Sequence, residues 1–420
     1  MKNKLYLIPL SALIAFLAIR EGLSEDIHGD YFIVWNAGLN FLEGRALYSR
    51  IGGAEEFLYP PFAPMFFALE ALIPFKIAAC LISIINLAGW FGIFYLAKKI
   101  IEFYMPNAKE TTNIKFFNYN ISYKWLWRLM FIATIRYFWH NFIWVNINVI
   151  VTLLTFGGIL LYLRKQIFFG LLCLVLATSL KVMPGLFLLI IALYNPPKIW
   201  LTMVIIASGL LVSVFMFRGW DVGIKDFTDY YEIALRPFLN GKVYLDWIAL
   251  SIPSMLLKLF TAHPDNFIDY HVLNLPVKTV KTVATVLQFL IIGIVLKQPL
   301  LDFIKVVFKK QTFGDSQISL KTWCLAYLSL VLVAGVSWEG HHVTLLLVLP
   351  ATILMIKNEN YKWRNALIII SLLVGLMTKD FLGSWLYDYS MEWSFITFLV
   401  MFIFIVLVTK TEKLGLKVGT

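Results

Sequence analysis

Charged side chains are scarce in this 420-residue chain, where Asp, Glu, Lys and Arg together make up 15% and hydrophobic residues 60%. So little charge, with a mean hydropathy of +0.78, excludes a soluble globular domain. The apolar residues form continuous runs rather than alternating with polar ones, which excludes a membrane β-barrel. The sequence therefore predicts an all-α integral membrane protein of many spans, forming a single domain over residues 1–420.

Metal-binding patterns are absent as well. The chain has three cysteines, Cys80, Cys173 and Cys324, each within an apolar run and without the spacing of metal ligands. This pattern predicts neither a disulfide framework nor a zinc site. No Asp-x-Asp pair occurs that would hold a metal for a nucleotide-sugar, so we expect no metal and no cofactor. The net charge of +11 is explained by basic cytoplasmic loops, and nucleic acid is not an expected partner.

Twelve apolar segments are long enough to predict membrane spans, with both chain ends in the cytoplasm. The first follows Lys2 and Lys4 without a small-residue cleavage site, so it is expected to be an uncleaved anchor. The twelve segments are 4–20, 77–97, 125–140, 142–163, 166–180, 184–195, 199–217, 278–297, 322–336, 343–357, 365–378 and 393–410.

Two shorter apolar stretches, 62–75 and 248–260, decide the topology. If both crossed the membrane, the basic loop 98–124 would face outward, against the tendency of Lys and Arg to stay inside. We therefore predict that both are re-entrant or interfacial helices at the outer face. The extracytoplasmic side then receives two long loops, 21–61 and 218–277.

The predicted spans hold few ionisable residues in their interiors, whereas an ion-driven transporter needs them there. Polar residues gather instead at the outer ends of spans, which favours a reaction site near the outer membrane surface. A transporter or flippase for a lipid-linked glycan stays open as the alternative.

Asp30 is the first candidate for chemistry. It precedes a predicted amphipathic interfacial helix, Tyr31 to Leu42, with Gly44 near its end. An aspartate there can act as a general base that accepts a proton from a hydroxyl, or it can serve only as a helix cap. Asp26 is the reserve candidate for the base.

Cationic residues at other outer span ends could serve a lipid phosphate. Lys181 could stabilise charge on a departing phosphate, or could be an ordinary lysine that extends toward water. His341 and His342 are adjacent and so point in different directions, which argues against a shared metal. At least one of them could contact a phosphate or the acceptor, or both could simply lie at the membrane interface. Further candidates are Arg136 for the phosphate, and Tyr59, His140, Asn148 and Glu339 for the substrate; Asn148 could alternatively tie helices together.

In chain order these motifs resemble glycosyltransferase family 87, over about residues 20 to 350. The matching positions are Asp30, Gly44 with Tyr48, Tyr59-Pro60-Pro61, Lys181 with Pro184, and the pair His341-His342. One departure is plain. Where the family often has Gly-Gln-x-Asn, this chain has Val145-Asn146-Ile147-Asn148 and keeps only the last residue.

The resemblance implies the multi-span GT-C architecture and a polyprenyl-phosphate sugar as donor. Asp30 would be the base, with Lys181 and a histidine near the donor phosphate. The expected activity is inverting transfer of a hexose, with mannose as the expected sugar, to a lipid or glycan hydroxyl. It would occur at the outer face of a bacterial cytoplasmic membrane, among membrane lipids.

Overall fold

The computed structural model describes residues 16, 19–20, 23, 30–48, 57–117, 119–243, 248–262, 271–309, 313, 317–356 and 358–411. The chain divides into two compact units, and each is described by itself. Unit 1 comprises residues 1–96, 138–185 and 201–240, and unit 2 comprises residues 97–137, 186–200 and 241–420.

Unit 1 consists of helices. Its own elements are α2 (Asp30–Leu42), α3 (Ala63–Ala71), α7 (Asn148–Leu163), α8 (Ile167–Leu180), α11 (Trp220–Asp229), the π-helical turn η2 (Tyr230–Leu235) and α12 (Arg236–Leu239). Four further helices, α4 (Phe75–Tyr104), α6 (Tyr123–Ile143), α9 (Gly185–Tyr194) and α10 (Pro197–Arg218), have residues in both units.

Unit 2 is also mainly helical. Its own elements are α5 (Ala108–Thr111), β1 (Asn113–Phe116), β2 (Tyr119–Ser122), α13 (Ile252–Phe260), α14 (Val277–Lys309), α15 (Leu320–Val333), η3 (Glu339–Thr344), α16 (Leu345–Met355), η4 (Asn358–Asn360), α17 (Tyr361–Leu376), α18 (Lys379–Glu392) and α19 (Phe395–Lys410). Strands β1 and β2 pair antiparallel with Asn113 opposite Ser122. This small hairpin lies in a predicted loop, where polar residues alternate with isoleucine and aromatic residues outside any apolar run, and the described part of the chain is otherwise helical as expected.

The structure agrees with a helical membrane protein but does not confirm twelve crossings. The first predicted segment lies almost entirely outside the described residues, and each of the other eleven coincides with a helix. Helices α4, α10 and α14 are long and apolar enough to span a membrane, and the pair α17 and α18, bent by 97°, would be a fourth. Most other apolar helices have 10–17 residues, which is shorter than a bilayer core of about 30 Å requires.

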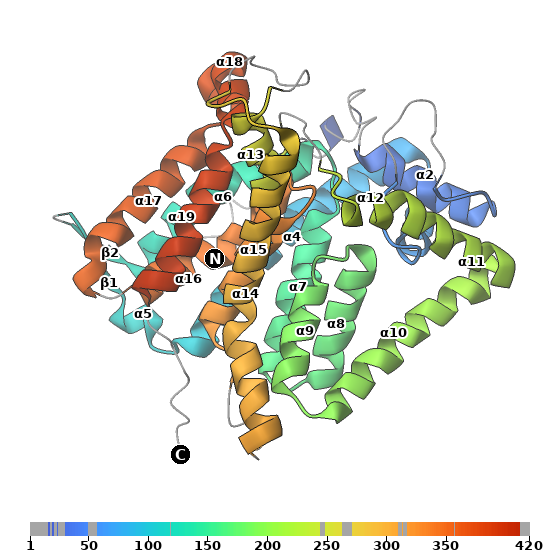
Figure 1. Ribbon diagram of the computed structural model, residues 1–420, viewed down its shortest axis with the longest axis horizontal. Coiled ribbons are helices and arrows are strands. Elements are labelled where there is room, and N and C mark those ends of the chain that lie inside the picture. The colour runs from blue at the N-terminus through green and yellow to red at the C-terminus, as the bar shows by residue number, and fades with distance from the viewer. Residues whose placement is uncertain are drawn as a thin grey trace, which may run out of the picture. The chain divides into compact units, whose positions relative to one another are not determined.

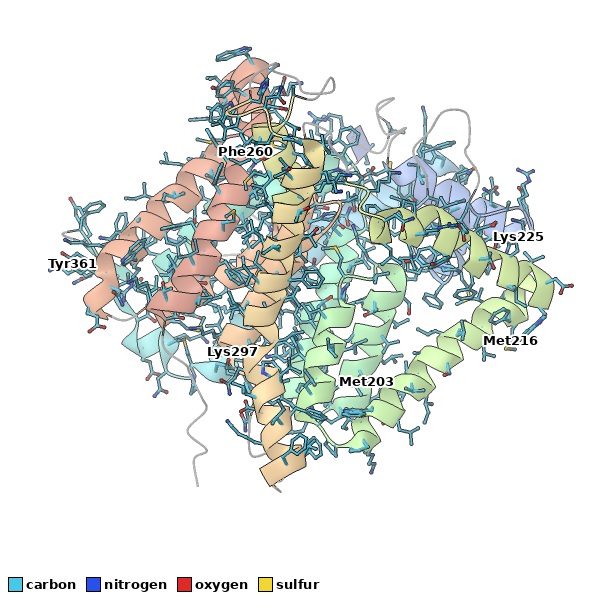
Figure 2. The ribbon with its side chains drawn as sticks, in the orientation of Figure 1. Met203, Met216, Lys225, Phe260, Lys297 and Tyr361 are labelled. Atoms are coloured by element: carbon cyan, nitrogen blue, oxygen red, sulfur yellow. The ribbon has the colours of Figure 1, made fainter. Side chains whose placement is uncertain are left out.

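Two of the spanning helices, α10 and α14, are exposed along most of their length, since only 6% and 22% of their most apolar stretches are buried. The side chains of α10 surround it on the ribbon without covering neighbours (Figure 2), and Met216 is 79% exposed. By contrast, α7 and α8 lie side by side (Figure 1) because glycines let their backbones meet. A Cβ on Gly158 would lie 2.9 Å from the Gly170 carbonyl oxygen. Small residues at helix contacts are common in membrane proteins.

The amphipathic helix predicted over Tyr31 to Leu42 is confirmed as α2. Its buried residues Val34, Ala37 and Phe41 recur at helical spacing and join a cluster with Phe67 of α3. Helices α2 and α3 approach closely at Gly38, where an added Cβ would lie 2.4 Å from the Phe67 carbonyl oxygen. Helix α3, with nine residues, is about 13 Å long and too short to cross the membrane.

Arg218, the last residue of α10, holds the other end of α2. Its side chain forms a buried ion pair with Asp226 of α11, at 2.8 Å from Nε to Oδ2. The same guanidinium donates to the carbonyl oxygens of Phe41 and Arg45, and lies over the Phe41 ring. The chain leaves α2 at Gly44, whose φ of +70° is the left-handed value that favours glycine at a helix end.

Candidate active site

Asp30 is the first residue of α2, and its carboxylate is held by an amide from elsewhere in unit 1. The Asn146 Nδ2 donates to Asp30 Oδ2 over 2.7 Å. The next residue, Tyr31, is fully buried and donates from its hydroxyl to Glu70 Oε2 of α3, 3.1 Å away. Hydrogen bonds from two successive side chains thus fix the start of α2, while Asp30 stays partly exposed.

Asn146 lies in the turn between α6 and α7, which ends α6 in a Schellman motif. The Asn146 N–H donates to the Asn141 carbonyl over 3.0 Å, and the Val145 N–H donates to the Phe142 carbonyl over 3.3 Å. Val145 takes the left-handed conformation that this motif requires, with φ of +48°. From α4, Asn86 Nδ2 donates to the Asn146 carbonyl over 3.0 Å and supports the turn.

Asn148 begins α7 and connects this turn to Lys181. Its backbone N–H donates to Asn146 Oδ1 over 3.1 Å, and its Nδ2 donates to Asn141 Oδ1 over 3.0 Å. The Lys181 Nζ donates to Asn148 Oδ1 over 2.7 Å. A continuous hydrogen-bonded path therefore runs from Asp30 through Asn146 and Asn148 to Lys181, which we call the asparagine path.

Lys181 follows α8 with an extended backbone (φ −152°, ψ 121°), so its side chain leaves the helix direction. Its Nζ lies 5.8 Å from the centre of the Tyr59 ring, within the range of a cation–π contact. Tyr59 opens the Tyr-Pro-Pro turn and is held in place by the Tyr48 hydroxyl, which donates to its carbonyl oxygen over 2.7 Å. The turn near the end of the first long loop thus lies beside the lysine.

Burial disfavours the charged forms of Asp30 and Lys181, the two ends of the asparagine path. It raises the pKa of Asp30, against the hydrogen bond from Asn146 and the nearby charges of His140 and Lys181. Burial also lowers the pKa of Lys181 to about 8, against the favourable charge of Asp30. A carboxyl group with a raised pKa beside a lysine with a lowered pKa is typical of reactive sites.

Arg136 and Glu339, two other predicted site residues, pair with each other in unit 2. Their side chains are 1% and 4% exposed, and the Arg136 Nε donates to Glu339 Oε1. Arg136 also donates to the Val374 carbonyl over 2.8 Å, and the Tyr387 hydroxyl donates to Glu339 Oε2 over 2.8 Å. The arginine charge therefore has a buried carboxylate partner, and its role at a phosphate stays a prediction.

The histidine pair lies in η3 of unit 2, and the backbone of Trp338 binds both rings. The Trp338 N–H donates to His341 Nδ1 over 3.1 Å, and His342 Nδ1 lies 3.1 Å from the Trp338 carbonyl oxygen. His342 is fully buried near the Tyr137 ring, and His341 is 8% exposed. These contacts stabilise the start of the helix, while a phosphate contact for either histidine stays a prediction.

The structure brings the predicted residues together in two groups. Asp30, Tyr59, His140, Asn148 and Lys181 lie in unit 1, and Arg136, Glu339, His341 and His342 lie in unit 2. The reserve base, Asp26, lies outside the described residues. In the described part of the chain, no three His, Cys, Asp or Glu side chains are grouped to hold a metal ion.

Three asparagines of unit 1 were missed by sequence reasoning as members of the site: Asn86, Asn141 and Asn146. A signal for them existed, because each amide stands in or beside an apolar segment, where an unpaired polar group is costly. The break between spans that was predicted at residue 141 lies at residues 144–147, because α6 continues to Ile143 before the Schellman motif ends it.

Comparison with known protein families identifies one family for this chain. The model for glycosyltransferase family 87 matches residues 57–296, more than half of the chain. The match contains Tyr59, Asn146, Asn148 and Lys181, while Asp30 lies before it. A search of curated proteins gave no match.

Proposed function

This chain belongs to glycosyltransferase family 87, and we propose that it transfers a hexose, with mannose as the first candidate, from a polyprenyl-phosphate carrier. The acceptor is a hydroxyl group of a lipid or glycan. The observation that carries the proposal is the asparagine path, which joins a carboxylate to a cation within one unit. Those are the two groups that such a transfer requires.

Asp30 acts as the general base. The acceptor oxygen attacks the anomeric carbon of the sugar, and its proton passes to the Asp30 carboxylate. Attack from the face opposite the phosphate inverts the configuration at that carbon. Asp30 Oδ2 accepts from Asn146, and Oδ1 makes no hydrogen bond with the part of the chain that the structure describes. This second oxygen is therefore the one offered to the acceptor.

Lys181 stabilises the leaving group. As the bond between the anomeric carbon and the phosphate oxygen breaks, its electron pair stays on the phosphate, and an ammonium group there lowers the barrier. A lipid phosphate leaves without taking a proton, so the second carboxyl group that glycosidases use as an acid is not needed. Tyr59, beside the Lys181 Nζ, is placed to contact the sugar or the carrier.

We assign the reaction to the outer face of a bacterial cytoplasmic membrane. The support is the distribution of charge along the sequence, since the predicted cytoplasmic segments carry most of the 36 Lys and Arg residues. On that topology Tyr59, near the end of the first outer loop, and Lys181, at the end of α8, share the outer side, in agreement with the contact between them.

Transfer of radiolabelled mannose by the purified protein tests the proposal. The protein is incubated in detergent with polyprenyl-phosphate mannose and candidate lipid acceptors, without a second membrane compartment. Asp30→Asn should reduce the rate by about 10² to 10⁴, the usual contribution of a general base. The matched control is Asp221→Asn, the same change at an exposed position of α11.

Asp221→Asn should transfer mannose at the rate of the unchanged protein. Full activity of a folded Asp30→Asn variant would refute the base assignment. If sugar crossed reconstituted vesicles but no product formed with any acceptor, the protein would be a transporter instead.

A further inference from the structure

Within the described residues, Asn146 donates the side-chain hydrogen bond to the carboxylate of Asp30, and the orientation of its amide follows from its other contact. Its Oδ1 accepts from the Asn148 backbone N–H, a group that can only donate. The Nδ2 must therefore be the atom that faces Asp30 Oδ2, at 2.7 Å. The amide cannot turn over without placing two acceptors, or two donors, against each other.

The backbone turn that presents Asn146 is held in a costly conformation. Val145 is β-branched and has φ of +48°, where such residues are rare because the backbone conformation is strained. Its side chain is fully buried and packs in a cluster with Tyr31 of α2 and Ala78, Ala79 and Ile82 of α4. Since Tyr31 adjoins Asp30, the packing that holds the turn also holds the carboxylate.

We propose that Asn146 is a positioning residue for the reaction, which holds Asp30 Oδ2 so that Oδ1 meets the acceptor hydroxyl. This inference rests on the proposed role of Asp30 as the base.

The hydrogen bond from Asn146 also affects the pH at which Asp30 is deprotonated and can act as a base. The N–H of Asn146 lowers the pKa of Asp30, as do the charges of His140 on α6 and Lys181 after α8, while burial raises it. Loss of the amide N–H removes one of the opposing contributions, so the pKa of Asp30 must rise. Since the base acts deprotonated, the acidic limb of the pH–rate profile must move to higher pH.

Three substitutions at this position separate positioning from simple support of the fold. Asn146→Ala removes the amide, Asn146→Asp keeps its size but replaces the donor with a negative charge, and Asn146→Gln keeps the amide on a longer chain. We measure kcat, the KM for polyprenyl-phosphate mannose and the pH profile of kcat/KM, with the thermal midpoint of unfolding as a check on folding. The control is Asn240→Ala, at an exposed asparagine that ends α12.

Asn146→Ala should lower kcat by about 10- to 100-fold, as expected of a reacting group displaced by about 1 Å, with KM changed little. The acidic limb of its pH profile should move to higher pH, and the limb of Asn146→Asp should move further. Asn146→Gln should recover part of kcat and part of the shift in the acidic limb. Asn240→Ala should match the unchanged protein.

Two outcomes would overturn the inference. One is an Asn146→Ala variant whose acidic limb is unchanged. If that variant were only less stable, Asn146 would have a structural role alone. If Asn146→Ala did not fold, an unshifted limb in Asn146→Asp would decide in the same sense. Should Asp30→Asn stay fully active, the proposed function itself would fail, whatever the Asn146 variants do.

Discussion

Gly38→Ala should push α2 away from α3 and displace Asp30. A Cβ at this position would lie 2.4 Å from the Phe67 carbonyl oxygen, 2.5 Å from the Phe67 carbonyl carbon and 2.9 Å from the Ala68 nitrogen, where ordinary contact begins at 3.4 Å. All three atoms belong to the backbone of α3, so no side chain can rotate to make room. The helices must separate by about 1 Å, at a cost of about 1–3 kcal/mol.

Thermal unfolding in detergent and mannose transfer measure the two consequences. We expect a fall of several degrees in the unfolding midpoint, together with a loss of activity that can reach about 10²-fold, since Asp30 moves with α2. Gly209→Ala is the matched control, because a Cβ there has nothing within 4 Å and alanine favours the helix. Equal midpoints and equal activities for the two variants would refute the close crossing of α2 and α3.

The charges of unit 1 give two further predictions. Burial lowers the pKa of Lys181 to about 8, so the KM for the donor should rise as pH increases past that value, and Lys181→Arg should remove this dependence; a KM independent of pH in the unchanged protein would contradict it. Asp226→Asn leaves Arg218 with a buried, uncompensated charge. The free energy of unfolding, measured by thermal denaturation, should fall by about 3–5 kcal/mol. Asp229→Asn, which breaks the exposed pair with Lys225, should cost at most about 1 kcal/mol, and similar losses in both variants would refute the difference in burial.

Local patterns predicted the helical elements well. The helix predicted after Asp30 is α2, and the segment predicted over 184–195 is α9, because helical periodicity and apolar runs depend on neighbouring residues. Crossing the membrane depends on the length of each helix and on what surrounds it. The apolar runs near 148–163 and 167–180 form helices of 16 and 14 residues, so the predicted count of twelve spans is not confirmed.

Partners distant in sequence were the part that could not be predicted. Arg136 and Glu339 were each assigned to substrate from their residue type and position. In the structure they neutralise each other across 203 residues of chain, and nothing in either local segment signals that pairing. The asparagines are different. An amide in an apolar segment predicts a hydrogen bond to another polar group, although the sequence does not identify that group.

Val145 is the clearest case of a residue whose backbone strain is offset by the packing of its side chain. The left-handed conformation costs a β-branched residue about 1–2 kcal/mol relative to glycine. Full burial of a valine side chain returns about 1.5–3 kcal/mol, and Val145 is fully buried against α2 and α4. The two contributions nearly cancel, so the turn survives without glycine. Beside Val145, Asn146 supplies the amide group that the Asp30 carboxylate contacts.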